Sequence, residues 1–458
     1  MTEQEVAERP RRAAQPLAPQ ASAPGYLQQR VAFPAPTVAH DLPPQVITRP
    51  GRVRDVGRRG TRLTTPQLLT VLTTACVLTV LLLGTVATTF LVRGADALQR
   101  ARHDAQQLVR VQQIEADLLR ADALAASSFL VGASAGAQDR ADHAAAVDEV
   151  SRLLVEAARA QPADAPALQE VNSELVRYTA AVAQARAQRG SDRAAAAAAL
   201  QDAGARLRST AVPRLEATAE ANAARVGAGV PDLALVAVPA VALLTLAVLG
   251  WTLRTVAVRF HRRVNVGLAA AAVLVLLGGA VPTAVLASAA GVVADLDRGA
   301  LADVRQLSAA RASAHDARAL EGLALVSPGA AAGHEDAWQQ RSEQVLAALH
   351  AAGAQELVPA WQRHLDAHRQ IRTLADRGDR TGAVAAATGQ GEGSSRATAE
   401  EFQTALAPVL ARDVAAADAA LTRQRGVLLA VVAGSVLATA AAGAAALAGL
   451  RARAREYE

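Results

Sequence analysis

His364 and His368 are the residues whose types and spacing in this sequence come nearest to a metal site. They are four residues apart, with Asp366 between them, so one helix would carry both imidazole rings on the same face. Two histidines in this arrangement can bind a metal ion. The alternative, which we favour, is that both are solvated residues on a helix. We therefore predict no metal site and no cofactor.

Two glycine-containing segments also resemble functional motifs. Gly389-Gln390-Gly391-Glu392-Gly393 resembles a phosphate-binding loop, but neither a preceding strand nor a following Lys-Ser or Lys-Thr pair accompanies it. We interpret it as a flexible insertion before a helix. Arg377-Gly378-Asp379 spells an adhesion tripeptide, yet an earlier segment reads Arg189-Gly190-Ser191-Asp192 in a corresponding position, which favours a turn between helices. With no catalytic signature among these motifs, we predict that the protein is not an enzyme.

Three aromatic residues and two prolines complete the candidates. Tyr178, Trp338 and Trp361 could line a ligand site, but we favour the alternative that they fill cores built of alanine and leucine. Pro213 and Pro408 each fall in the last helix of a polar stretch, where a proline removes a hydrogen bond and bends the helix. They are either hinges that relay motion to a membrane span or static breaks. The sequence identifies no ligand-binding residue.

Four apolar segments must position these residues. Each is uncharged and exceeds the roughly 20 residues needed to cross a hydrocarbon core of about 30 Å. Buried helices of soluble proteins rarely run this long without a charge. We predict membrane spans at 68–91, 233–253, 266–289 and 427–450. Because no charge lies within them, an ion-coupled transporter is disfavoured.

Arginines at the span ends predict the orientation. They cluster before the first span, in the loop 254–265 and in the tail 451–458. The positive-inside rule places these segments, and therefore both termini, in the cytoplasm of a multi-pass plasma-membrane protein. Residues 1–63 are rich in proline and arginine, which predicts a disordered basic cytoplasmic tail. The pI of 10.3 reflects these flanks, so we predict membrane contact and no nucleic-acid partner.

The two polar stretches, 93–230 and 291–426, are predicted to lie outside the membrane as helical bundles. In the first, apolar residues recur at steps of three and four from Leu98 to Ala121. Breaks divide it into four helices, of which the first and last are longest. This pattern predicts an antiparallel four-helix bundle above a two-helix stalk.

The second stretch repeats the order of the first, which indicates a tandem duplication of a span–bundle–span unit. The expected fold is an all-α membrane protein with four transmembrane helices and two tandem external four-helix-bundle modules. Whether the two bundles pack within one chain, or between copies in a homo-oligomer, is left open.

The arginine-rich tail, Thr64-Thr65-Pro66 before the first span and two large helical modules on four spans resemble a known family. It is the actinobacterial four-span membrane sensor associated with a glutamine-binding lipoprotein and protein kinase G (GlnX-like). The modules also resemble chemoreceptor-type four-helix sensor domains. The resemblance implies a sensor that contacts a solute-binding lipoprotein outside and influences a cytosolic kinase inside. It carries over no functional residue.

We therefore expect a non-enzymatic transmembrane sensor that docks a ligand, or a liganded binding protein, at the distal ends of its bundles. The loop 255–264 and the tail 451–458 are short, so a cytosolic partner would contact residues 1–63. The alternatives are a non-sensing envelope scaffold and an accessory subunit of a transporter.

Overall fold

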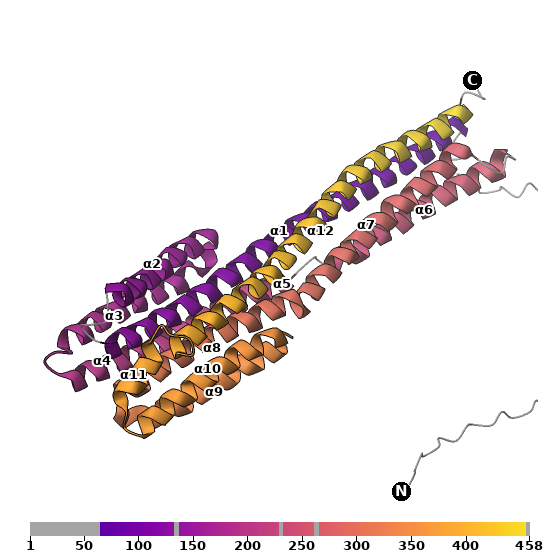
Figure 1. Ribbon diagram of the computed structural model, residues 1–458. Helices are drawn as coiled ribbons and strands as arrows, with labels where there is room; N and C mark the ends of the chain where they lie inside the picture. The colour runs from indigo at the N-terminus through magenta and orange to yellow at the C-terminus, as the bar shows by residue number, and fades with distance from the viewer. Residues whose placement is uncertain (1–64, 132–136, 229–231, 261–264, 455–458) are drawn as a thin grey trace, which may run out of the picture. The chain divides into compact units, whose positions relative to one another are not determined.

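Helices make up the regular structure that the computed structural model describes, at residues 65–131, 137–228, 232–260 and 265–454 (Figure 1). No strand occurs in these four ranges, so the predicted all-α class is confirmed. The predicted tail 1–63 and residues 261–264 of the predicted loop lie outside the described ranges.

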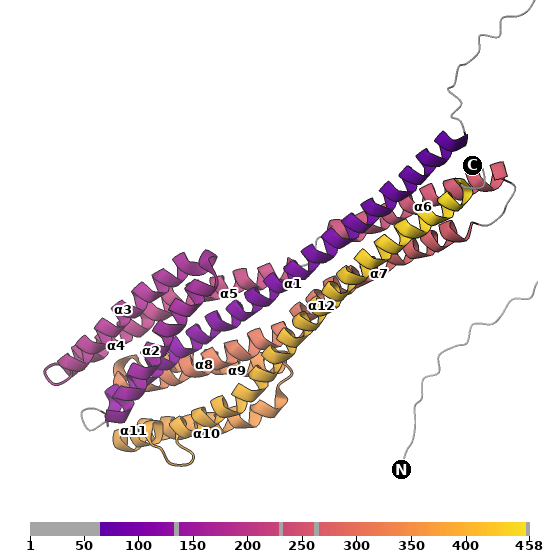
Figure 2. The same cartoon turned by 90° about the horizontal axis from the view of Figure 1, so that it is seen from above.

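Four helices carry the predicted membrane spans. They are α1 (Thr65–Val131), α6 (Asp232–Phe260), α7 (Val266–Arg298) and α12 (Ser395–Ala454). All four contain a stretch long and apolar enough to cross a membrane, in agreement with the predicted number of spans. α1 has 67 residues and α12 has 60, so each extends far beyond its span, to roughly 100 Å and 90 Å. The two long helices lie side by side in both views (Figures 1 and 2).

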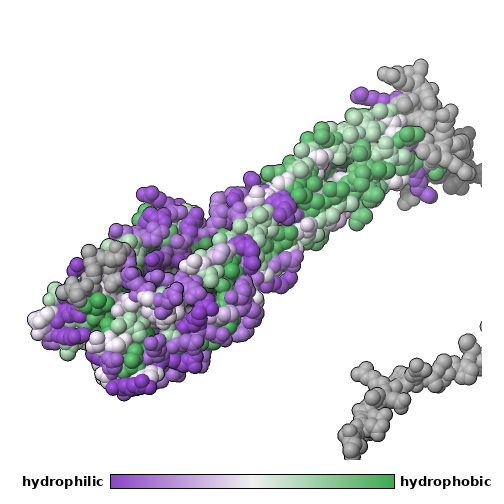
Figure 3. Space-filling view, in the orientation of Figure 1, coloured by the Kyte–Doolittle hydropathy of each residue, from purple (hydrophilic) through white to green (hydrophobic). Residues whose placement is uncertain are grey.

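The surface around the spans is apolar, whereas the surface around the shorter helices is mainly hydrophilic (Figure 3). Leu243 on α6 and Leu437 on α12 are 67% and 71% exposed. In a lipid bilayer these leucine side chains would contact acyl chains and not water, so their exposure costs no free energy. The chain is therefore a multi-pass membrane protein.

The first extramembrane stretch begins with the part of α1 beyond its span. α2 (Ala137–Ala160) and α3 (Ala165–Gln188) follow, joined by a 3₁₀ turn at Pro162–Asp164. α4 (Arg193–Arg206) continues without a break through a π-helical turn at Leu207–Ala211 into α5 (Val212–Gly227).

The second extramembrane stretch has a similar order of helices. α8 (Ala300–Val326) is followed by α9 (Ala331–Ala351), α10 (Val358–Asp376) and the short α11 (Arg380–Thr388). The glycine segment between α11 and α12 then leads into the last helix.

Corresponding turns in the two stretches use the same contacts. Asp192 caps α4 by accepting a hydrogen bond from a backbone N–H, and Asp379 caps α11 in the same way. Arg189 and Arg380 each donate to a carbonyl oxygen near the end of the first helix of their stretch. Gly378 has a φ of 81°, so the Arg-Gly-Asp tripeptide is the predicted turn between helices. The tandem duplication itself stays a prediction.

The two stretches pack against one another within the chain. Their shared core contains Ile114 and Leu118 from α1 together with Ala312 and Leu323 from α8. Gly322 lies so close to α1 that an added Cβ would stand 3.0 Å from that of Ala126. Within one chain, the two stretches therefore share a core.

The expected two-helix stalks are wrong. Near the membrane, one apolar cluster combines residues of α1, α5, α6, α7, α8 and α12, among them Leu98, Val226, Leu296 and Leu421. An isolated pair of helices would leave part of these apolar faces in water, so the helices of both halves converge instead. α1 and α12 pass through this region uninterrupted, whereas Gly299 separates α7 from α8.

Close packing of α7 on α12 predicts the effect of one glycine substitution. A Cβ at Gly267 would stand 2.7 Å from the backbone of Ala445 and of Gly449, whereas one at Gly278 meets nothing within 4 Å. Gly267→Ala should therefore destabilise the protein by about 1–3 kcal/mol. Gly278→Ala, on the same helix, should be neutral or stabilising by up to about 1 kcal/mol. Thermal unfolding of the purified protein in detergent measures both; equal effects would contradict the packing.

Candidate functional site

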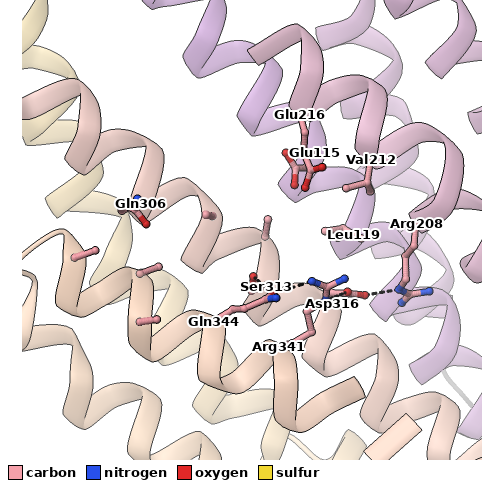
Figure 4. Close-up of a pocket in the computed structure, with 15 residues that line it drawn as sticks. Glu115, Leu119, Arg208, Val212, Glu216, Gln306, Ser313, Asp316, Arg341 and Gln344 are labelled. Carbon is pink, nitrogen blue, oxygen red and sulfur yellow. Dashed lines mark hydrogen bonds and ion pairs between the residues drawn. The ribbon is translucent and has the colours of Figure 1, made fainter. Parts of the chain in front are cut away.

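A cavity of about 510 Å³ lies between the two extramembrane stretches. Its walls come from α1, from the π turn with α5, and from α8 and α9 (Figure 4). The volume is within the range of small-molecule sites, about 300–1,000 Å³. The cavity is the candidate functional site because its walls join the two halves of the chain.

Arg208 at one end of the cavity links the two halves. It lies in the π turn, where the Val212 backbone N–H donates to the Leu207 carbonyl oxygen five residues back. Its Nη2 donates to Asp122 Oδ2 on α1 at 2.7 Å, and its Nε donates to Asp316 Oδ1 on α8. Both aspartate side chains are only 3% exposed. Burial lowers the pKa of Arg208, but the two carboxylates outweigh it and raise this pKa overall.

Arg341 on α9 binds the other carboxylate oxygen of Asp316, with Nε to Oδ2 at 2.6 Å. Its Nη1 donates to Gln344 Oε1 at 2.8 Å. On the far side of the bridge, the Tyr178 hydroxyl donates to Asp122 Oδ1 at 3.2 Å. Both arginines that line the cavity are thus already paired with aspartates.

Glu115 on α1 and Glu216 on α5 lie together away from this ionic cluster (Figure 4). Within the described part of the chain, neither carboxylate has an ion-pair or hydrogen-bond partner. Burial, and secondly the charge of Glu216, raise the pKa of Glu115 to about 8, although Arg341 opposes the shift. A cation beside these two carboxyl groups would favour the ionised form of Glu115, so this end of the cavity suits a positively charged group.

Short side chains form the remaining wall. Alanines of α8 and α9 give an apolar surface, and three polar side chains interrupt it. The alanines are Ala309, Ala312, Ala347, Ala348 and Ala351, and the polar residues are Gln306, Ser313 and Gln344. The cavity therefore offers an acidic end, an apolar side and neutral hydrogen-bonding groups.

The expectation that His364 and His368 are solvated is wrong. They are 0% and 3% exposed, because α10 turns this face toward α8, α9 and α12. Their Nδ1 atoms contact Thr398 Oγ1 at 3.2 Å and Glu321 Oε2 at 2.8 Å, respectively. Across the residues that the structure describes, no group of three or more histidine, cysteine or carboxylate side chains is arranged to hold a metal.

His368 belongs instead to a buried polar network. Its ring stacks on that of Trp338, with centroids 3.5 Å apart, and its Nε2 lies 3.3 Å from Glu335. Burial lowers the pKa of His368, but the bonds to Glu321 and Glu335 outweigh it and raise the pKa overall. Ser395 Oγ donates to Glu321 Oε1 at 2.5 Å and ties the network to the start of α12.

The predicted core role of the aromatic residues is confirmed. Tyr178, Trp338 and Trp361 are 3%, 6% and 0% exposed. Pro213 lies two residues after the π turn, and Pro408 lies inside the uninterrupted α12. Neither proline lines the cavity.

The residues of the cavity were not identified from the sequence. Glu115 and Asp122 are seven residues apart on α1, so they share a helix face with Leu118 and other core residues. Charged residues on an otherwise apolar helix face could therefore have identified Glu115 and Asp122 from the sequence. Arg208 and Asp316 gave no such signal, because their pairing joins residues 108 positions apart.

Similarity to known proteins covers the first extramembrane stretch. Residues 97–230 match the family model described as an actinobacterial sensor domain. This match supports a sensing role and contains the π turn with Arg208 and both glutamates of the cavity. No curated protein and no solved structure matches the chain.

The bridge by Arg208 predicts a large effect of removing its charge. Arg208→Gln leaves Asp122 and Asp316 buried with less compensation and should destabilise the protein by about 3–5 kcal/mol. Arg206 pairs with Glu174 but is 63% exposed, so Arg206→Gln should cost less than about 1 kcal/mol. Thermal unfolding compares the two variants, and a similar small loss in both would contradict a structural role of the bridge.

The raised pKa of Glu115 predicts a pH dependence of stability. Between about 4.5 and 8 the folded protein binds more protons at this group than the unfolded chain, so stability falls as pH rises through this window. Glu115→Gln should remove this loss, so that at pH 8.5 its free energy of unfolding exceeds that of wild type by on the order of 1–2 kcal/mol.

The same comparison at pH 5 should show little difference between Glu115→Gln and wild type. Because the raised pKa of His368 acts in the same direction, the variant must be compared with wild type at each pH. Glu220→Gln, an exposed substitution on α5, is the matched control. Parallel pH profiles for wild type and Glu115→Gln would refute the assignment.

Proposed function

We propose that the protein is a transmembrane sensor in which a small cationic ligand binds the cavity between the two extramembrane stretches. The observation that carries this proposal is the unpaired Glu115 and Glu216 in a cavity walled by both stretches. The sensor-domain match over residues 97–230 supports it, because that region supplies both glutamates.

The charges of the cavity wall favour a cationic ligand. The lining residues include the carboxylates of Glu115, Glu216 and Asp316 and the guanidinium groups of Arg208 and Arg341. Both guanidinium groups bind the carboxylate of Asp316, and Arg208 also binds that of Asp122. A ligand ammonium near the glutamates would supply the missing positive charge. At an effective dielectric constant of about 20, an opposite charge at 4 Å interacts by roughly 4 kcal/mol before its desolvation is subtracted.

The apolar and amide groups of the wall restrict the rest of the ligand. The alanines accommodate a short hydrocarbon body, and Ser313 and Gln344 can hydrogen-bond a neutral polar group. An anionic ligand is disfavoured, since the arginines would first have to leave Asp316. The ligand class is therefore a small amine, alone or as part of a molecule with a neutral polar end.

The helices provide a route from the cavity to the membrane. Glu115 lies 24 residues beyond Leu91 on the uninterrupted α1, or about 36 Å along its axis. Closing of α1 and α5 around a ligand, against α8 and α9, would shift α1 relative to the second half of the chain. Such a relay requires the ligand to bind two conformations with different affinity. Pro213, adjoining the π turn that carries Arg208, is the proposed hinge of the first stretch, and Pro408 that of the second.

The proposed output lies on the cytoplasmic side. With both termini in the cytoplasm, residues 1–63 would contact a partner such as a kinase. A solute-binding lipoprotein docking at the distal ends of the bundles would deliver the ligand. The protein itself would act by binding and not as an enzyme.

The test uses the full chain in lipid nanodiscs and a panel of small cations, such as putrescine and choline, with zwitterionic glutamine and neutral or anionic analogues for comparison. A ligand of the folded state at 100 times its Kd raises the free energy of unfolding by about 2.7 kcal/mol. We expect a cationic member to raise the melting temperature, Glu115→Gln with Glu216→Gln to abolish the shift, and Glu220→Gln to retain it.

Binding should also weaken as pH falls below about 8, because Glu115 is then protonated in the ligand-free protein. A shift produced only by neutral or anionic compounds would overturn the cationic ligand. If neither small molecules nor a binding protein alter the melting temperature, the scaffold alternative replaces the sensor.

A further inference from the structure

A second recess lies within the membrane-spanning part of the chain, between α1 and α12. It measures about 700 Å³ and is lined mainly by small or β-branched residues. Gly84, Thr85, Thr88 and Arg93 come from α1, and Val436 and Thr439 from α12. We propose that this groove binds a phospholipid, with an acyl chain along the groove and the phosphate on Arg93. The proposal is independent of the sensing cavity.

Close contact of the two helices explains the groove. A Cβ at Gly84 would stand 2.4 Å from the Thr439 side chain, so glycine is required for the helices to approach here. The Thr439 hydroxyl donates to the Ser435 carbonyl oxygen of its own helix at 2.7 Å. Thr85 and Thr88 are too short to fill the space beside this contact. The result is an apolar recess on a surface that faces lipid.

The length of the groove matches one leaflet of a bilayer. Its lining on α1 runs from Leu81 to Arg93, twelve residue steps, or about 18 Å. Half of a hydrocarbon core of about 30 Å is about 15 Å. The α1 side of the groove therefore spans the leaflet that adjoins the extramembrane helices, whereas the α12 side runs only from Val436 to Ala440. A helix from a second copy would contact α1 over both leaflets, so the limited length favours an acyl chain.

Arg93 marks the headgroup end. It follows the last apolar residues of the span, and its guanidinium lies 6.0 Å from the centroid of the Phe90 ring. Along the described part of the chain no carboxylate forms an ion pair with it. A guanidinium donates two parallel hydrogen bonds to a phosphate. A zwitterionic headgroup would bring its own ammonium to compete for the phosphate, so a phospholipid of net negative charge is the expected ligand.

The test measures retained lipid by native mass spectrometry, and melting temperature, for the delipidated full chain given phosphatidylglycerol or phosphatidylcholine. We expect one phosphatidylglycerol to be retained preferentially and to raise the melting temperature. Arg93→Gln should weaken its binding at least fivefold and remove the preference over phosphatidylcholine. Thr85→Phe should fill the groove and abolish retention of either lipid.

Matched controls separate the groove from general lipid contact. Arg100→Gln removes an exposed arginine outside the groove, and Leu437→Phe enlarges a lipid-facing residue of α12 that does not line it. Both should bind phosphatidylglycerol like wild type. Because Thr85 is exposed, its substitution should leave the melting temperature without lipid unchanged.

Three outcomes would overturn the proposal. One is equal retention of both lipids by wild type, and another is unchanged retention by Thr85→Phe. The third is a wild-type dimer that Thr85→Phe dissociates, which would assign the groove to a second copy of the chain.

Discussion

The buried ion bridge from Asp122 through Arg208 to Asp316 is the constraint on which the arrangement of the extramembrane helices depends. Burying charged groups is unfavourable unless they are paired, so α1, the π turn and α8 must meet at this point. Once they do, the apolar faces of both stretches join in one core, and the alanines of α8 and α9 stand opposite Glu115 and Glu216. The cavity follows from this packing, because the short side chains beside the ion bridge leave space unfilled.

The fold class and the spans were predictable from local patterns. Four long uncharged segments have few alternatives to membrane helices, and helix periodicity is visible from Leu98 onward. The turn at Arg377-Gly378-Asp379 was also predictable, since glycine tolerates the positive φ that the turn requires. These features depend on residues close to one another in sequence.

Contacts between distant segments were not predictable in the same way. The sequence could not show that α1 packs on α8, and two-helix stalks were predicted where the helices of both halves converge. His364 and His368 were expected to be solvated residues on a helix, but their helix turns this face inward and brings His368 to Glu321. In the candidate site, Arg208 and Asp316 come from different extramembrane stretches. Their pairing depends on how these stretches pack, and the spacing of residues along the sequence does not reveal it.

The four membrane helices differ in how they leave the membrane. α1 and α12 continue as single helices from their spans into the extramembrane stretches, whereas α7 gives way to α8 at Gly299. A single helix transmits translation along its axis over its whole length, while a joint between helices absorbs it. Among the described helices, this unbroken pair is also the first and the last. Sliding of α1 against α12 would thus be carried along the whole of both helices, whereas the joint at Gly299 would absorb part of a movement of α8.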